Sequence, residues 1–160
     1  MLLKLRDDWF EAERLHRAAA EGDIEAVTTL IAERVPLNEF DDIGHTPLHY
    51  AAKHSRLEVA DLLLSAGAQI NARDEETNWD TPIAVAARDA SAEMVALLLD
   101  RGADPSIQRW MAMDANDQAA QRRDESKKRI VELLAGYCSG PDDRGITDRS
   151  TPTRRKRRAG

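Results

Sequence analysis

An internal repeat constrains the fold of this chain more than any other feature of its sequence. Residues 46–71 (TPLHYAAKHSRLEVADLLLSAGAQIN) align with residues 81–106 (TPIAVAARDASAEMVALLLDRGADPS) at a constant shift of 35 residues, with no gap. The matched positions include a Thr-Pro pair, an Ala-Ala pair, a Leu triplet and a Gly-Ala pair. A fixed period of this length is typical of a solenoid, in which each unit buries its apolar face against the next.

Two weaker copies flank this pair. At a shift of 33 residues, positions 15–38 match residues 48–71, and a degenerate copy ends in RIVELLAG at 129–136. Terminal units are expected to drift in sequence, because each must replace a buried face with a polar one. The repeat therefore predicts four units, at about 9–38, 39–71, 72–106 and 107–136.

Capping signals predict two short antiparallel helices in each unit. Thr46 and Thr81 have hydroxyls that can cap a helix, and each precedes a proline at the first helical position, where a missing N–H costs nothing. Gly67 and Gly102 stand where a left-handed C-cap ends the second helix. We place the second helices near 57–65 and 92–100. The first of these has an apolar stripe that we expect to face the core, made of Leu57, Ala60, Leu63 and Leu64.

These motifs resemble the ankyrin repeat family. Residues 44–52 read GHTPLHYAA and are similar to the family's motif G-x-T-P-L-H-x-A-A, which precedes a Leu-rich helix ending in G-A-x-x-N. The resemblance covers about residues 9–136 and implies an all-α ankyrin-repeat solenoid of about four helix-turn-helix units with hairpin fingers. It also implies that His49 links adjacent repeats by hydrogen bonding. The polar segments 38–45 and 71–80 are the expected fingers.

Charge divides the sequence into an acidic body and a basic end. Residues 1–140 contain 16 Lys and Arg and 26 Asp and Glu, a net charge of −10. Residues 141–160 contain 7 Lys and Arg and 3 Asp, a net charge of +4, so the whole chain has a net charge of −6. An acidic body repels nucleic acid and anionic membranes, so we expect neither as a partner. The ankyrin-repeat domain is placed at 1–137. Residues 138–160 have little to bury and are expected to form a disordered basic tail.

The basic run Arg154–Arg158 within that tail has three interpretations. It is an import signal, a weak tether to nucleic acid or membrane, or a solubilising segment.

The chain has one cysteine and no apolar run of the roughly 20 residues that a membrane helix needs, so we expect a cytoplasmic protein.

The sequence offers no pattern of residues suited to catalysis. His45, His49 and His54 are close in sequence but do not share a helix face at ligand spacing, so we expect no metal site. Cys138 has no histidine near it in sequence and is interpreted as a bystander thiol. Nucleophile-elbow, Walker and dinucleotide-binding motifs are missing from the sequence. We therefore expect no enzyme activity and no cofactor.

The expected function is protein binding through the concave face made by the fingers and the inner helices. The resemblance implies that partners contact the finger tips and the exposed ends of the first helices. In this chain those positions are Asp42, Ile43, His45, Lys53 and His54 in the second unit, Asn78, Trp79, Asp80, Arg88 and Asp89 in the third, and Trp110 near the fourth. The two tryptophans are candidate anchors. Alternatively, Trp79 folds onto its own finger and Trp110 covers the end of the core.

Two roles remain open for such a binding module. The first is a general adaptor. The second is a dedicated inhibitor, such as an immunity or antitoxin-like protein that blocks one basic enzyme. Because the body is acidic, the expected partner is a protein with a basic patch. The chain itself is expected to be a monomer when free.

Overall fold

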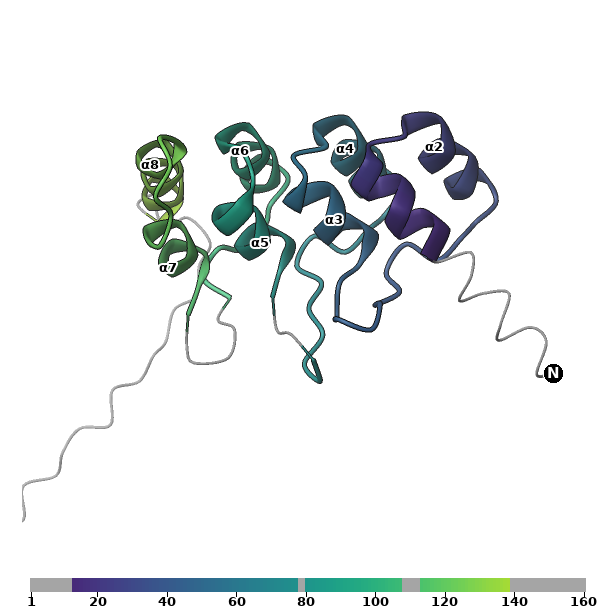
Figure 1. Cartoon of the computed structure of the whole chain (residues 1–160), viewed down its shortest axis with the longest axis horizontal. Helices are drawn as coiled ribbons and strands as arrows, with labels where there is room; N and C mark the ends of the chain where they lie inside the picture. Colours follow the sequence, from purple (N-terminus) through teal and green to yellow (C-terminus); the bar gives the residue numbers. More distant parts are fainter. Residues whose placement is uncertain (1–12, 78–79, 108–112, 139–160) are drawn as a thin grey trace, which may run out of the picture.

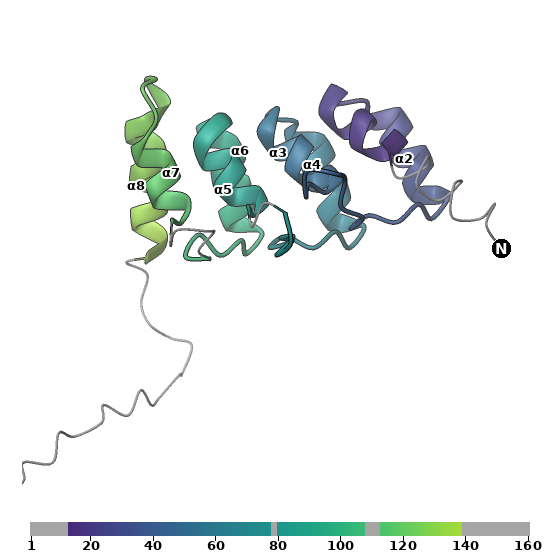
Figure 2. The same cartoon turned by 60° about the horizontal axis from the view of Figure 1, so that its bottom comes forward.

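The computed structural model describes residues 13–77, 80–107 and 113–138, and these form an all-helical solenoid (Figure 1). Pairs of helices stand side by side in chain order, and the connections between pairs project to one side (Figures 1 and 2). None of the residues in these three ranges is in a strand. The prediction of an all-α ankyrin-type solenoid is therefore confirmed. The expected fingers are present as turns in the part of the chain that is described.

The helices fall into two rows. One row contains the helical segment 13–21, α3 (Pro47–Lys53), α5 (Pro82–Asp89) and α7 (Ala115–Ala120), and we call these the inner helices. The other row contains α2 (Ile24–Ala32), α4 (Leu57–Ser65), α6 (Ala92–Asp100) and α8 (Ser126–Cys138), and we call these the outer helices. Inner helices α3, α5 and α7 pack on one another in order, and so do the outer helices. The expected tail lies outside the described residues from position 139 onward.

Capping residues set the helix ends where the sequence predicts them. The Thr81 hydroxyl accepts a hydrogen bond from the Ala84 N–H at 3.3 Å, which caps α5. The helices α4 and α6 span 57–65 and 92–100 as expected. Gly67 and Gly102 follow them with φ of 104° and 90°, in the left-handed region where glycine carries no Cβ penalty.

Small side chains let the helix pairs approach closely. Ala51 and Ala52 of α3 are fully buried, as are Ala86 and Ala87 of α5. In the outer row, the core side of α4 is made of Val59, Ala60 and Leu63, which are 1% exposed or less. One expectation about this helix is wrong, because Leu57 is 37% exposed. Leu57 precedes Val59 by two residues, about 200° around the helix, so it points away from the core.

The fourth unit begins without a Thr-Pro pair. Asp114 replaces it as the cap of α7, and its carboxylate accepts hydrogen bonds from the N–H groups of Asn116 and Asp117 at 2.8 and 3.1 Å. After α7, the Arg122 guanidinium donates to the carbonyls of Ala87 and Ala90 at 3.2 and 2.8 Å. A charged side chain thereby ties the last unit to the end of α5.

Candidate protein-interaction face

The Asp41 carboxylate shapes the finger of the second unit. Its Oδ1 accepts hydrogen bonds from the N–H groups of Ile43 at 3.1 Å and His45 at 2.8 Å, and its Oδ2 accepts from the Tyr50 hydroxyl at 2.7 Å. Gly44 completes the turn at φ 74°, which a side chain would strain. Burial raises the pKa of Asp41, but the three hydrogen bonds outweigh it and hold the pKa below its ordinary value. This finger therefore presents a fixed negative charge.

A hollow of about 440 Å³ opens beside this finger, between it, the helical segment 13–21 and α3. Two apolar side chains at its edge face solvent, since Phe40 is 40% exposed and Ile43 is 53% exposed. The lining residues are Glu13, His16, Arg17, Ala20, Phe40, Asp41, Asp42, Ile43 and Tyr50. Exposed apolar surface next to carboxylates suits a side chain with an aliphatic body and a cationic end.

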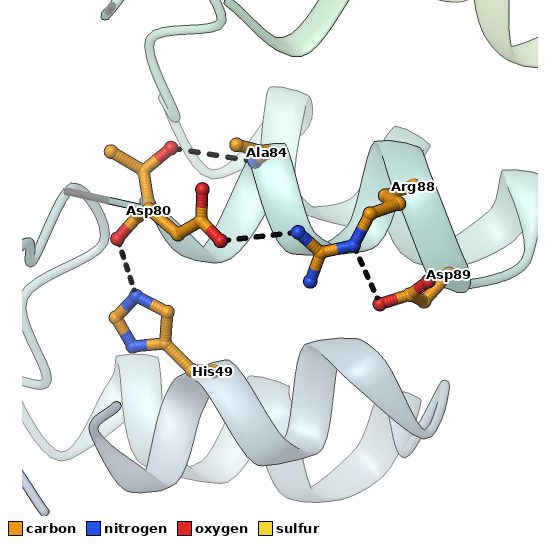
Figure 3. A network of polar contacts seen from close by, with 6 residues as sticks. His49, Asp80, Ala84, Arg88 and Asp89 are labelled. Atoms are coloured by element: carbon orange, nitrogen blue, oxygen red, sulfur yellow. Dashed lines mark hydrogen bonds and ion pairs between the residues drawn. The ribbon is translucent and has the colours of Figure 1, made fainter. Parts of the chain in front are cut away.

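His49 links the second unit to the third. Its Nδ1 accepts a hydrogen bond from the Thr46 N–H at 3.0 Å, so its Nε2 carries the proton and donates to the Asp80 carbonyl at 2.9 Å (Figure 3). The ring is fully buried, and burial lowers its pKa to about 4. The link between adjacent repeats that the resemblance implies is therefore present.

The same link recurs one unit earlier. His16 Nε2 lies 3.1 Å from the Glu39 carbonyl and 3.0 Å from the His45 carbonyl. The His45 ring stacks on His49 with centroids 5.1 Å apart and meets the Tyr50 ring edge-on. His45 is only 5% exposed, and burial lowers its pKa. Histidines at the base of the fingers thus build the joint between units.

Two of the residues expected to contact a partner are buried, so the expectation that their side chains are exposed is wrong. His45 packs between His49 and Tyr50, as described above. Asp80 is 2% exposed because its carbonyl accepts from His49 and its carboxylate pairs with Arg88 Nη1 at 3.1 Å (Figure 3). Both contribute to the joint beneath the face.

The other expected contact residues fall into two groups. Asp42 and Ile43 are exposed at the finger tip, Lys53 and His54 are exposed at the end of α3, and Asp89 is exposed at the end of α5. Arg88 is partly buried and also pairs with Asp89 at 3.0 Å, which holds both side chains at the end of α5 (Figure 3). Asn78, Trp79 and Trp110 lie outside the described residues.

Comparison with known proteins gives the family of this repeat architecture. A family model described as ankyrin repeats (3 copies) matches residues 3–74, and a model described as ankyrin repeats (many copies) matches residues 63–114. The chain belongs to the ankyrin repeat family. Proteins of this family are typically non-catalytic and bind other proteins, and this chain is a protein-interaction module.

Individual ankyrin-repeat relatives differ widely in length. Mouse protein phosphatase 1 regulatory subunit 27 is 36% identical over 117 residues, which cover 72% of each chain. Human inversin is 33% identical over 136 residues, 82% of this chain but only 12% of its own length. The orangutan (Pongo abelii) ankyrin repeat and SOCS box protein 11 is 32% identical over 132 residues, 81% of this chain and 38% of its own length.

Part of the ankyrin-repeat face was not expected from the sequence. Phe40, Tyr50, Glu13 and Arg17 all line the hollow, and none of them was expected to contact a partner. Phe40 could have been identified as a candidate contact from the sequence, because it is a lone aromatic residue in a polar finger next to two aspartates. The Glu13 and Arg17 positions follow only from the packing of the first inner helix beside the finger.

Within the described ranges, no group of three His, Cys, Asp or Glu side chains is placed to hold a metal ion. Among the described helices, none is both long and apolar enough to cross a bilayer.

Proposed function

We propose that this ankyrin-repeat chain binds one protein partner through the finger tips and the inner-helix ends, with the hollow beside Phe40 and Ile43 as the anchor point. The observation that carries the proposal is the exposure of these two apolar side chains at the edge of a hollow whose lining includes three carboxylates and one arginine. Large apolar side chains left in water beside a concavity mark interaction sites, because a partner gains free energy by covering them.

Charge indicates what the partner presents. Glu13, Asp41 and Asp42 line the hollow, and Asp74 and Glu75 stand on the next finger. A partner with a basic patch matches this surface, so association should be fast at low salt and slower at high salt. An arginine or lysine at the centre of that patch can place its stem on Phe40 and its charge on Asp42.

A second candidate role is a dedicated inhibitor that blocks one basic enzyme, of the immunity or antitoxin kind. The relative matched over 72% of its own length is named a regulatory subunit of a phosphatase, which is an observation in favour of an enzyme as partner. The two roles differ in outcome, because an inhibitor abolishes its partner's activity and an adaptor leaves it intact.

Trp79 and Trp110 are proposed as further contacts at the fingers of the third and fourth units. The chain is proposed to be cytoplasmic, and to be a monomer when it is free. Sedimentation of the purified protein would measure its oligomeric state.

Affinity capture from a native extract tests the proposal when three baits are compared. The baits are the natural chain, a Phe40→Ser/Ile43→Ser variant, and an Ile24→Ser/Leu57→Ser variant, which removes a similar exposed apolar area from the outer helices. We expect a protein with a basic surface on the natural and outer-helix baits and at least about tenfold less of it on the finger variant. Equal retention by the finger variant, with loss from the outer-helix variant, would place the binding site on the opposite side.

A further inference from the structure

A second, unassigned groove runs along the outer helices, away from the fingers. It has a volume of about 730 Å³ and lies mainly between α4 and α6, with Ile24 of α2 and Arg129 of α8 also on its wall. Its apolar lining includes Leu57, Leu62 and Leu97. Leu57 is 37% exposed and Ile24 is 41% exposed, so this apolar surface faces solvent. We call it the outer groove.

Four carboxylates share the outer groove with these apolar side chains, namely Glu58, Asp61, Glu93 and Asp100. Two of them already pair with guanidinium groups from the next unit along the solenoid. Arg101 pairs with Asp61, and Arg129 Nη1 lies 3.0 Å from Glu93 Oε1. Within the described part of the chain, Glu58 and Asp100 make no ion pair and are exposed. The outer groove therefore has room and charge for further cations.

We propose that the outer groove docks the basic run Arg154–Arg158 of the same chain. An arginine side chain suits this lining, because its aliphatic stem covers apolar surface while its guanidinium binds a carboxylate. The run carries five consecutive cationic side chains, and the outer groove contains Glu58 and Asp100, which make no ion pair with another described residue. The proposal does not depend on the finger face, which lies on the other row of helices.

The length of chain between the two features permits this docking. Arg129 precedes Cys138 by nine residues on α8, a distance of about 14 Å along a helix. The helices α6 and α4 lie one and two helix spacings further, about 20 Å in total. The fifteen residues 139–153 span at most about 50 Å when extended, so they can return the run to the outer groove. A tether of this length holds the run at a high effective concentration near the carboxylates.

A spin label on the full chain tests the docking directly. The label is placed at Ala159→Cys in a Cys138→Ser background, and the methyl signals of leucine and isoleucine are followed by NMR. At low salt, we expect the signals of Leu57, Leu62 and Leu97 to lose intensity while that of Ile43, in the finger, does not. At high salt the intensities should return, because exposed ion pairs are screened. Equal loss on both faces, or no loss, would overturn the proposal.

Two variants and one mixture complete the test. Glu58→Lys/Asp100→Lys should lower the ratio of docked to free basic run by about tenfold or more. Replacing the five basic residues of the run by serine should have the same effect, and this change leaves the helical units untouched. The control variant is Glu75→Lys/Glu76→Lys, which makes the same change in charge on a finger. This control should leave the ratio of docked to free run unchanged. Intensity loss that persists in the first two variants would contradict the proposal. In a mixture of spin-labelled chains and isotope-enriched chains, loss of methyl signal intensity would show that the basic run of a second copy occupies the outer groove. That result would overturn docking within one chain.

Discussion

The Nε2 of His49 donates a 2.9 Å hydrogen bond to the carbonyl of Asp80, 31 residues further along the chain. The same ring accepts a hydrogen bond from the N–H of Thr46 at the start of its own helix. One buried side chain thus fixes the start of α3 and the entry to α5 together. Since the fingers emerge at these points, the position of the proposed binding face depends on this ring.

We predict that His49→Ala destabilises the chain by about 2–4 kcal/mol. The substitution leaves a buried N–H and a buried carbonyl without their partner, and each such group costs about 1–3 kcal/mol. Urea unfolding followed by circular dichroism measures the change. His54→Ala is the matched control, because His54 is exposed at the end of the same helix and its loss should stay within about 0.5 kcal/mol. Equal effects of the two substitutions would contradict this role.

Stability should fall as the solution is acidified from about pH 6.5 to pH 4. Burial lowers the pKa of His49 to about 4, whereas the unfolded chain binds a proton near pH 6.5. In this window the unfolded state holds more protons, so the free energy of unfolding decreases with falling pH, by up to about 3 kcal/mol from this residue. Denaturant midpoints measured across the window test it.

His49→Gln should flatten that pH dependence, since glutamine does not titrate in this range. The remaining slope is expected from His45, whose pKa burial also lowers. A variant that keeps the full slope would show that other groups cause the loss of stability in acid.

Leu63→Ala should destabilise the chain by about 2–5 kcal/mol, because Leu63 is fully buried between units and its removal leaves a cavity. Leu57 is on the same helix but is 37% exposed, so Leu57→Ala should cost less than about 1 kcal/mol. Thermal and urea unfolding of the two variants side by side measure the difference. A larger loss for Leu57→Ala would contradict the placement of Leu63, and not Leu57, in the core.

The helix pattern could be predicted from the sequence because its signals are local. Threonine caps with prolines at the first helical position mark the starts of α3 and α5, and a glycine follows α4 and α6. These signals act within one turn, and α4 and α6 have the predicted bounds. The stacking of the units could be predicted from the repeat, because a unit with an apolar face must bury that face against a neighbouring unit. The structural role of His49 followed from the family resemblance.

The errors in the candidate site concern contacts of individual side chains. Asp80 looks like an exposed finger aspartate in the sequence, but the partners that bury it are His49 and Arg88, which lie outside that finger. His45 is buried because the His49 ring stacks on it. Phe40 and the hollow arise where the first inner helix meets the second finger. None of these contacts follows from the spacing of the repeat.

Hydroxyl-radical footprinting of the complex is the most direct test of the central claim, once a partner has been captured. The measurement compares side-chain oxidation in the free and bound chain. We predict that oxidation of Phe40 and Ile43 falls several-fold on binding, because these exposed side chains become buried. Oxidation of Leu57 and Val131, on the outer helices, should not change. Protection of Leu57 and Val131 with unchanged Phe40 and Ile43 would contradict the proposed binding face.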